Sequence, residues 1–397
     1  MKIKRNILNQ LLSEQDRAEV SILLGPRQVG KTYLLLELCN IYKNNGLRTK
    51  YYNLEIPSHS IEFNKNDNEL FEMLTTDVDI VFIDEFHYLK NASKLFKAIY
   101  DSDKKIKIYA SGSSSIEIHK HLQESLAGRR LVTKIFPLSL DEYKQKKALS
   151  HVDNYLVYGG LPELVHFNNK DEQMRILREI LETYIQKDIK SLIKEENIRA
   201  FNNLLYLIAE NQGSIVQLSN LASEVGLSSK TISHHLSILE NTYVIYPLHS
   251  YSKNLGNELK KSHKYFLYDS GIRNAMLKDF GNPSHREDKG ALYESLIMTE
   301  LFKQLKPNME LKFWRTKQGD EVDFVILINR KPYLIEVKTS LSGIEIPAGI
   351  RKFINKYPET IGATVFCLQR KPSIIYQNIE IRFLRHEDVI NFLSNYV

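Results

Sequence analysis

The chain has few cysteines and no long apolar run. Only Cys39 and Cys367 occur among 397 residues, and their separation matches no metal-binding or redox spacing. We therefore expect two reduced core thiols in a reducing cytoplasm. No run reaches the roughly eighteen apolar residues that a spanning helix needs, so the sequence predicts no membrane contact. The opening residues also lack the apolar segment of a secretory signal.

A strong excess of one charge is also missing. Lysine and arginine number 54 against 48 acidic residues, a formal net charge of +6. A mildly basic balance permits contact with nucleic acid and does not establish it. The length exceeds what one core usually supports, which predicts two or three domains.

The stretch GPRQVGKT, from Gly25 to Thr32, has the spacing of a phosphate-binding loop. An apolar run over 18–25 precedes it and predicts a strand, while KTYLLLELCNIYKNN has helical periodicity. Backbone N–H groups of such a loop face the phosphates, Lys31 adds a positive charge, and the Thr32 hydroxyl binds Mg²⁺. The predicted cofactor-binding residues in this segment are Gly25, Gln28, Val29, Gly30, Lys31, Thr32 and Tyr33.

Two further predicted strands end in polar residues. The run over 78–83 leads into Asp84, predicted to hold Mg²⁺, and Glu85, predicted to orient and deprotonate the attacking water. KIKIYASGSSS ends in Ser111, Ser113 and Ser114, and we expect the Ser113 hydroxyl to sense the γ-phosphate or hold the water.

Arg129 and Arg130 follow Gly128. They are either an ordinary surface pair or, for Arg129, a charge presented to the γ-phosphate of a neighbouring subunit.

Four segments together carry a family resemblance: GPRQVGKT, FIDEFHYL, ASGSS and LAGRR…FPLSLDEY. They resemble prokaryotic AAA-type P-loop ATPases that carry a second, C-terminal domain, and the resemblance spans nearly the whole chain. It implies an α/β core, ATP and Mg²⁺ as ligands, and a homo-oligomer in which Arg129 completes a neighbour's site.

The middle of the chain predicts helices. Residues 141–210 include a long amphipathic stretch without Gly or Pro, interpreted as a helical lid on the ATPase core. Residues 211–251 predict a winged helix-turn-helix, with one helix ended by Gly226 and a second capped by Ser228 or Ser229. The side chains expected to face DNA are Lys230, Thr231, Ser233, His234 and His235. The alternative is a module used only for packing or oligomer contacts.

The last predicted domain, 252–397, carries a second set of chemical groups. Glu294 lies on a predicted helix, Asp323 on the strand EVDFVILI, and Glu336 and Lys338 on the next strand, PYLIEVKTS. Three carboxylates can bind Mg²⁺ or Mn²⁺ beside a scissile phosphate, and Lys338 can position or activate water. The spacing resembles the PD-(D/E)xK restriction-endonuclease-like fold. A fold that holds DNA or a partner without cleaving is the alternative.

These segments predict an α/β protein with an ATPase core over 1–140, the lid, the winged helix and the nuclease-like domain. The leading hypothesis is an ATP-driven enzyme that binds and cleaves DNA. The alternatives are an ATP-dependent switch that grips DNA or a partner protein without cutting, and a winged-helix transcription regulator.

Overall fold

A computed structural model describes most of the chain. The described residues are 3–113, 126–146, 152–184, 193, 198–253, 263–341 and 343–396. They form two compact units: Met1–Leu138 with 161–163 and 241–244, and Ser139–Gly160 with 164–240 and 245–397. Among the described residues, no helix has both the length and the apolar character needed to cross a membrane.

The first unit alternates strands and helices. Its elements are α1 (Leu8–Ser13), β1 (Val20–Gly25), α2 (Lys31–Asn44), β2 (Thr49–Asn53), α3 (Pro57–Glu62), α4 (Asp67–Thr75), β3 (Ile80–Asp84), η1 (Phe86–Tyr88), α5 (Ala92–Tyr100), β4 (Lys107–Ser113) and β5 (Arg130–Lys134).

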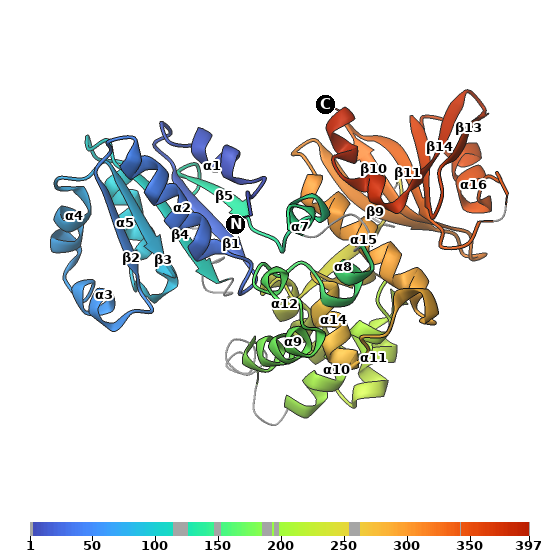
Figure 1. The fold of residues 1–397 in the computed structure, drawn as a ribbon, viewed down its shortest axis with the longest axis horizontal. Coiled ribbons are helices and arrows are strands. Elements are labelled where there is room, and N and C mark those ends of the chain that lie inside the picture. The colour runs from blue at the N-terminus through green and yellow to red at the C-terminus, as the bar shows by residue number, and fades with distance from the viewer. Residues whose placement is uncertain are drawn as a thin grey trace. The chain divides into compact units, whose positions relative to one another are not determined.

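The five strands form one parallel sheet in the order β2-β3-β4-β1-β5. Strands β1 and β3 are buried along their whole length, as expected for a sheet with helices on both faces. Right-handed crossovers place α2 on one face and α5 on the other, as Figure 1 shows. Because β4 lies between β1 and β3, its carboxyl end separates the glycine-rich loop from Asp84.

The second unit begins with helices and ends in an α/β region. Its elements are α7 (Leu140–Lys144), α8 (Val152–Tyr158), η3 (Leu164–His166), α9 (Lys170–Tyr184), α10 (Ile198–Glu210), β6 (Ile215–Val216), α11 (Leu218–Val225), α12 (Ser229–Asn241), β7 (Ile245–Ser250), β8 (His263–Leu267), α14 (Ser270–Leu277), η7 (Pro283–His285), α15 (Lys289–Gln304), β9 (Met309–Arg315), β10 (Glu321–Ile328), β11 (Lys331–Val337), α16 (Ala348–Lys356), β12 (Gly362–Cys367), β13 (Lys371–Tyr376), β14 (Ile379–Arg385), η8 (His386–Val389) and η9 (Phe392–Asn395).

One sheet runs through this unit in the order β13-β14-β12-β11-β10-β9-β7-β8-β6. The strand after α12 is part of it, because β7 pairs in parallel with β9 at His249 and Ser250. The structure therefore groups these residues differently from the predicted domains: the expected boundary at 251/252 lies next to a strand pairing and does not separate two units.

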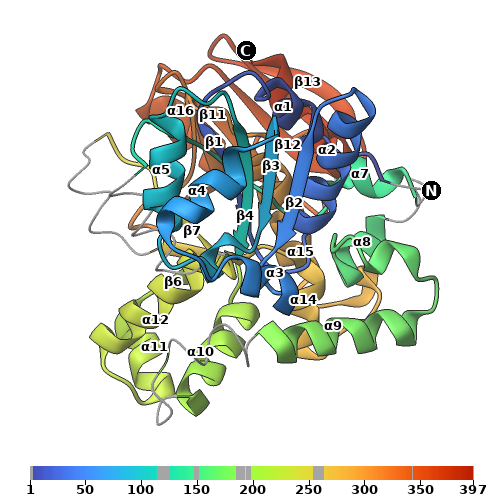
Figure 2. The same ribbon diagram turned by 90° about the vertical axis from the view of Figure 1, so that its left-hand side faces the viewer.

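Helices α11 and α12 lie together beside β6 (Figure 2). Gly226 ends α11 in a left-handed conformation with φ 72°, and the Ser228 hydroxyl accepts a hydrogen bond from Thr231 N at 3.1 Å, which caps α12. His235 was expected to face outward, and this is wrong. Its ring is buried against Phe201, 5.3 Å between centroids, because it shares the core-facing side of α12 with Ile232 and Leu236.

The carboxyl-terminal part follows the predicted order of helix, three strands, helix and strand, from α15 to β12. The strands β9, β10 and β11 form an antiparallel meander, and β11 pairs in parallel with β12. Helix α16 covers one face of this sheet through Ile350, Phe353 and Ile354, which pack with Trp314 and Val325. The classification of this part as restriction-endonuclease-like stays a prediction.

Candidate functional site

The glycine-rich loop follows the buried strand β1 and ends where α2 begins. Gly25 passes so close to Ile135 that a Cβ atom would lie 2.1 Å from its carbonyl oxygen, so only glycine fits. Gly30 is the N-cap of α2 with φ 90°, and Gln28 is also left-handed at φ 61°. These turns point the loop toward the helix N-terminus, the arrangement that binds phosphate through backbone N–H groups.

Lys31 is buried at the start of α2, and its ammonium bonds to the loop itself. Nζ donates to the carbonyl oxygens of Gly25 at 3.0 Å and Pro26 at 2.8 Å. Neutral carbonyls bind an ammonium less strongly than phosphate oxygens do. A triphosphate bound at the loop can therefore replace these two carbonyl oxygens as the partner of the Lys31 ammonium.

The neighbours of Lys31 differ in exposure. The Thr32 side chain is exposed, as a hydroxyl that binds Mg²⁺ has to be. Tyr33 is half-buried, and burial raises the pKa of its hydroxyl. Val29 is fully buried and packs the loop against the core.

Arg5 braces the loop, and the motif gave no sign of it. Its buried guanidinium donates to the Val29 carbonyl and to the Phe136 carbonyl, each at 2.8 Å. It thus ties the chain before α1 to the loop and to the segment after β5. A sequence motif contains only neighbouring residues, so a contact across 131 positions lies outside its reach.

Asp84 ends β3 with a fully buried carboxylate. It accepts hydrogen bonds from the Tyr51 hydroxyl at 3.0 Å and from the Ser111 hydroxyl on β4. Burial and the nearby Asp84 charge raise the pKa of Tyr51, so this hydroxyl keeps its proton. Both donors are neutral, which leaves the negative charge of Asp84 uncompensated by these two partners.

Glu85 follows in a left-handed conformation with φ 54° and ψ 48°. A left-handed backbone is uncommon for a residue other than glycine, asparagine or aspartate, and such positions concentrate at functional sites. Its backbone N–H donates to Ser111 Oγ at 3.4 Å, and its carboxylate lies 3.2 Å from His87 Nδ1. Ser111, which lies on β4, therefore contacts both Asp84 and Glu85.

The other residues predicted for nucleotide contact lie in two places. Ser113 ends β4 beside Gly25, but its side chain, like Ser114, lies outside the described part. Arg129 precedes β5, whose first residue pairs with Val20 at the start of β1. The five residues of β1 beyond that point span about 16 Å. Arg129 therefore lies at the amino-terminal ends of the strands, whereas the loop lies at their carboxyl-terminal ends. There it pairs with Asp101 at 2.8 Å. The structure therefore gives no support for a contact between Arg129 and a nucleotide at the loop of its own chain.

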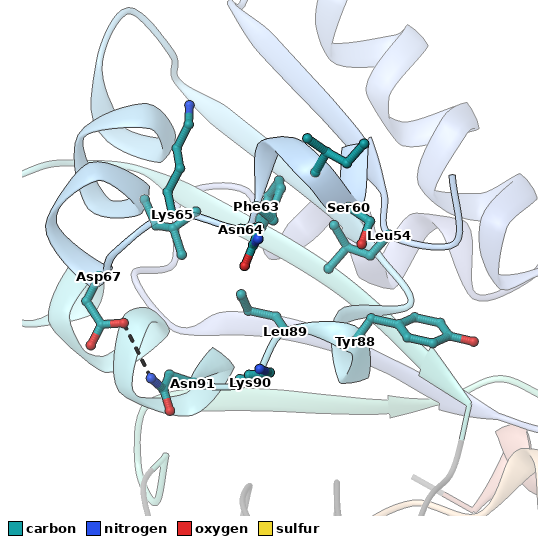
Figure 3. Close-up of a pocket in the computed structure, with 12 residues that line it drawn as sticks. Leu54, Ser60, Phe63, Asn64, Lys65, Asp67, Tyr88, Leu89, Lys90 and Asn91 are labelled. Carbon is teal, nitrogen blue, oxygen red and sulfur yellow. Dashed lines mark hydrogen bonds between the residues drawn. The ribbon is translucent and has the colours of Figure 1, made fainter. Parts of the chain in front are cut away.

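A pocket of about 350 Å³ lies beside the segment that follows Glu85, and Figure 3 shows the residues that line it. Leu54, Phe63, Leu70 and Tyr88 line it, and no residue of the glycine-rich loop does. Tyr88 connects it to the site, because its backbone N–H donates to the Glu85 carbonyl at 3.1 Å.

The structure brings the four C-terminal candidates together. The pairing of Phe324 with Ile335 places Asp323 opposite Glu336 on adjacent strands. Asp323 Oδ2 accepts from Val337 N at 2.8 Å, and Glu336 Oε2 accepts from Asp323 N at 3.4 Å. Lys338 Nζ contacts Glu336 Oε1 at 2.7 Å. Two carboxylates directly opposite each other repel, so their placement requires compensating cations.

A second lysine, absent from the predicted set, contacts the remaining acid. Lys264 on β8 lies 3.1 Å from Glu294 and 2.6 Å from Glu321, measured from Nζ to the carboxylate oxygens. Its side chain is 2% exposed. The sequence signal for it is weak: a single lysine in the run HKYFL, which otherwise reads as an ordinary partly buried strand. We call Glu294, Glu321, Asp323, Glu336, Lys264 and Lys338 the acid cluster.

Burial dominates the protonation of this cluster. Burial and the charge of Asp323 raise the pKa of Glu336 to about 8, against the opposing effect of Lys338. Burial likewise raises the pKa of Glu294 to about 7, although Lys264 lowers it. The pKa of Lys264 is raised too: burial would lower it, but the charges of Glu294, Asp323 and Glu321 outweigh that effect. Glu336 and Glu294 therefore hold their protons more tightly than free carboxyl groups do.

The predicted metal ligands do not fit a metal in this arrangement. Glu294 is held by Lys264, Glu336 by Lys338, and Asp323 by a backbone N–H group. Within the described ranges, no three Asp, Glu, His or Cys side chains are grouped so that they could hold a metal ion. The prediction of Mg²⁺ or Mn²⁺ at Glu294, Asp323 and Glu336 is therefore not supported.

Three family models match successive parts of the chain. Residues 17–144 match an AAA domain. Residues 149–282 match one domain of unknown function, DUF8612, and residues 289–384 match another, DUF4143.

Relatives of similar length occur in distant organisms. An uncharacterized protein of Methanocaldococcus jannaschii is 25% identical over 345 residues, covering 80% of this chain and 74% of the relative. An uncharacterized protein of Haemophilus influenzae is 26% identical over 329 residues, covering 76% and 78% of the two chains.

Solved structures give weaker similarity. A DNA replication initiation factor has a TM-score of 0.28 with 17% identity, over 57% of this chain and 70% of that one. AMPPCP-bound DnaA from Aquifex aeolicus has a TM-score of 0.30 with 15% identity, over 59% and 86%. Scores at this level do not establish a common fold. Residues 17–144 are similar to an AAA domain, and the glycine-rich loop at the start of α2 lies within them, which together support ATP binding by this part of the chain.

Proposed function

We propose that the chain is an ATP-driven switch that changes its grip on nucleic acid with nucleotide state and does not cut it. The proposed binding of ATP rests on the position of Lys31, whose ammonium group contacts the carbonyl oxygens of its own loop. Binding ATP transfers this ammonium from those carbonyls to the β- and γ-phosphates, where charge-assisted bonds are stronger.

Residue roles in hydrolysis follow from the same site. Glu85 accepts the proton of a water that attacks the γ-phosphorus, the new P–O bond forms as the β–γ bridge breaks, and ADP and phosphate leave. Ser111 positions both acids from β4. Thr32 and Asp84 are the residues that would hold Mg²⁺, whose charge offsets that of the phosphates.

Support for nucleic acid comes from α12. One side of this helix is buried, and the other exposes Lys230, Ser233, His234 and Ser237, which recur at helical spacing. Hydroxyl, imidazole and ammonium groups in such a row can contact phosphates. With a single lysine among these four residues, we expect weak binding that depends little on sequence, which disfavours an operator-reading regulator.

We do not propose DNA cleavage, because lysine side chains already pair with carboxylates of the acid cluster. We also propose assembly into a homo-oligomer, as the family resemblance implies; there Arg129, which lies far from its own loop, would act at the nucleotide of a neighbouring subunit.

The test measures binding of labelled single-stranded and duplex DNA to the full chain with a non-hydrolysable ATP analogue, with ADP and without nucleotide. We expect affinity to differ between the ATP-analogue and ADP states, and the difference to vanish in Lys31→Ala. Lys230→Ala should weaken binding and reduce the slope of log affinity against log salt by about 1, whereas Lys97→Ala, at an exposed position on α5, should not.

Equal DNA affinity in all nucleotide states, or none at low salt, would overturn the switch proposal while leaving the ATPase assignment intact. Degradation of the DNA in the presence of Mg²⁺ or Mn²⁺, lost in Lys338→Ala, would restore the cleavage hypothesis instead.

A further inference from the structure

Lys264 is the most deeply buried charge of the acid cluster. Its side chain, 2% exposed, extends from β8 across the Phe313 ring, 5.4 Å from Nζ to the ring centroid. An ammonium in such a place is costly unless several partners compensate it. Here two carboxylates do so, one from α15 and one from β10, at 3.1 and 2.6 Å.

The partners of Lys264 overlap the predicted metal ligands. Glu294, one of the three expected ligands, is directly bound to it. Glu321 lies two residues before Asp323 on β10, and, against the lowering effect of burial, the charges of both carboxylates raise the pKa of Lys264. A divalent ion at this position would have to lie about 2.0–2.6 Å from the same carboxylate oxygens. The ammonium group of Lys264 already contacts these oxygens.

Glu294 also lies close to the backbone at Gly213. Gly213 is left-handed at φ 77°, and a Cβ atom there would lie 3.3 Å from a Glu294 carboxylate oxygen. A side chain at position 213 would therefore crowd the Glu294 carboxylate.

We propose that Lys264 is a resident cation that stands in the place of a divalent metal, so that the acid cluster is a metal-independent ionic joint. The joint connects β8, which pairs with β7 and β6 beside the α11–α12 pair, to α15 and β10 of the carboxyl-terminal region. This goes beyond the proposed switch, because it assigns a role to the cluster whether or not DNA is bound.

The test is Mn²⁺ binding to the nucleotide-free full chain, measured by the loss of the free-ion electron paramagnetic resonance signal. We expect wild type and Asp323→Asn to bind Mn²⁺ equally, because no metal uses Asp323. Lys264→Met removes the ammonium while keeping an unbranched side chain, and should create a site at least about tenfold tighter than any in wild type. Adding Asp323→Asn to this variant should abolish the gain.

Lys312→Met is the matched control, since this lysine on the neighbouring strand β9 pairs with the exposed Glu310 at 3.1 Å. It should leave Mn²⁺ binding unchanged. Mn²⁺ bound by wild type and lost in Asp323→Asn would overturn the proposal, and so would a folded Lys264→Met that gains no site. If Lys264→Met fails to fold, the comparison of wild type with Asp323→Asn still decides.

Discussion

The predicted nucleotide site and the acid cluster each contain a buried lysine and a buried carboxylate, but these groups have different partners. At the nucleotide site Lys31 contacts neutral carbonyls, and Asp84 contacts neutral hydroxyls. In the acid cluster Lys264 and Lys338 contact the carboxylates themselves.

The charged groups of the first site have neutral partners, so a charged ligand can still bind them. The charges of the acid cluster already compensate one another. A phosphate or metal arriving at the first site gains strong charge-assisted bonds in exchange for weak ones. A metal arriving at the second must displace ion pairs already formed in a buried place. Composition alone therefore does not define a metal site; the partners of each charge do.

The largest effect is expected at Glu85. Glu85→Gln keeps the size of the side chain but removes the base, so ATP turnover should fall by about 10²–10⁴ with nucleotide affinity retained. Steady-state hydrolysis together with binding of a fluorescent ATP analogue checks this.

The control for this variant is Glu72→Gln on α4, an exposed residue of the same domain. Turnover that survives in Glu85→Gln at the wild-type rate would show that another group takes the proton.

Next in size is the joint. Lys264→Ala should lower the free energy of unfolding of the second unit by about 3–5 kcal/mol, because it leaves buried carboxylates without their cation. Lys338→Ala should cost far less, since that side chain is 39% exposed and water replaces the lost pair. Denaturant titration followed by hydrogen exchange in β8 measures both, and equal losses would contradict the special position of Lys264.

Ser111→Ala should have an intermediate effect on catalysis. The hydroxyl donates to Asp84 and receives the Glu85 N–H, so its loss loosens both acids together. We expect about a tenfold lower turnover, corresponding to one buried hydrogen bond to a charged group. Ser93→Ala on α5 serves as the control in the same assay.

A separate effect concerns pH. In the folded chain the pKa of Glu336 is about 8 against an ordinary 4.5, so the folded state holds an extra proton between these values. This contribution to stability is complete below 4.5 and is lost as pH rises to about 8.

Glu336→Gln cannot titrate, so its thermal unfolding midpoint should fall less over this pH range than that of wild type. Glu310→Gln, at a side chain 64% exposed, should follow wild type. A wild-type midpoint that rises across the range relative to Glu336→Gln would contradict the assigned direction.

Local signals predicted the strands, loop and helix around the glycine-rich segment, while the roles of the side chains there stay predictions. The glycine spacing, the apolar strand before it and the acids after β3 all depend on neighbours in sequence, and their elements form where expected. Tyr51, Arg5 and Lys264 could not be found in this way, because each acts through a contact that only the folded sheet creates. His235 illustrates the same limit within one helix: its polarity suggested exposure, but its position on the turn with Ile232 and Leu236 places it in the core.

The same reasoning explains the acid cluster. Alternation along β10 and β11 predicted that Asp323, Glu336 and Lys338 share one place, and the strand pairing brings them together. The lysine on β8 lies on a strand that precedes these segments in the sequence, so their alternation gives no sign of it. Its contacts with the carboxylates change what they can bind.

The most direct measurement is ATP binding and turnover by Lys31→Ala beside Lys43→Ala, an exposed lysine of the same helix. The account predicts a loss of about two to three orders of magnitude in turnover for the first, with much weaker nucleotide affinity, and no change for the second. If Lys31→Ala bound and hydrolysed ATP as wild type does, the glycine-rich loop would not be the nucleotide site and the proposed switch would have no driver.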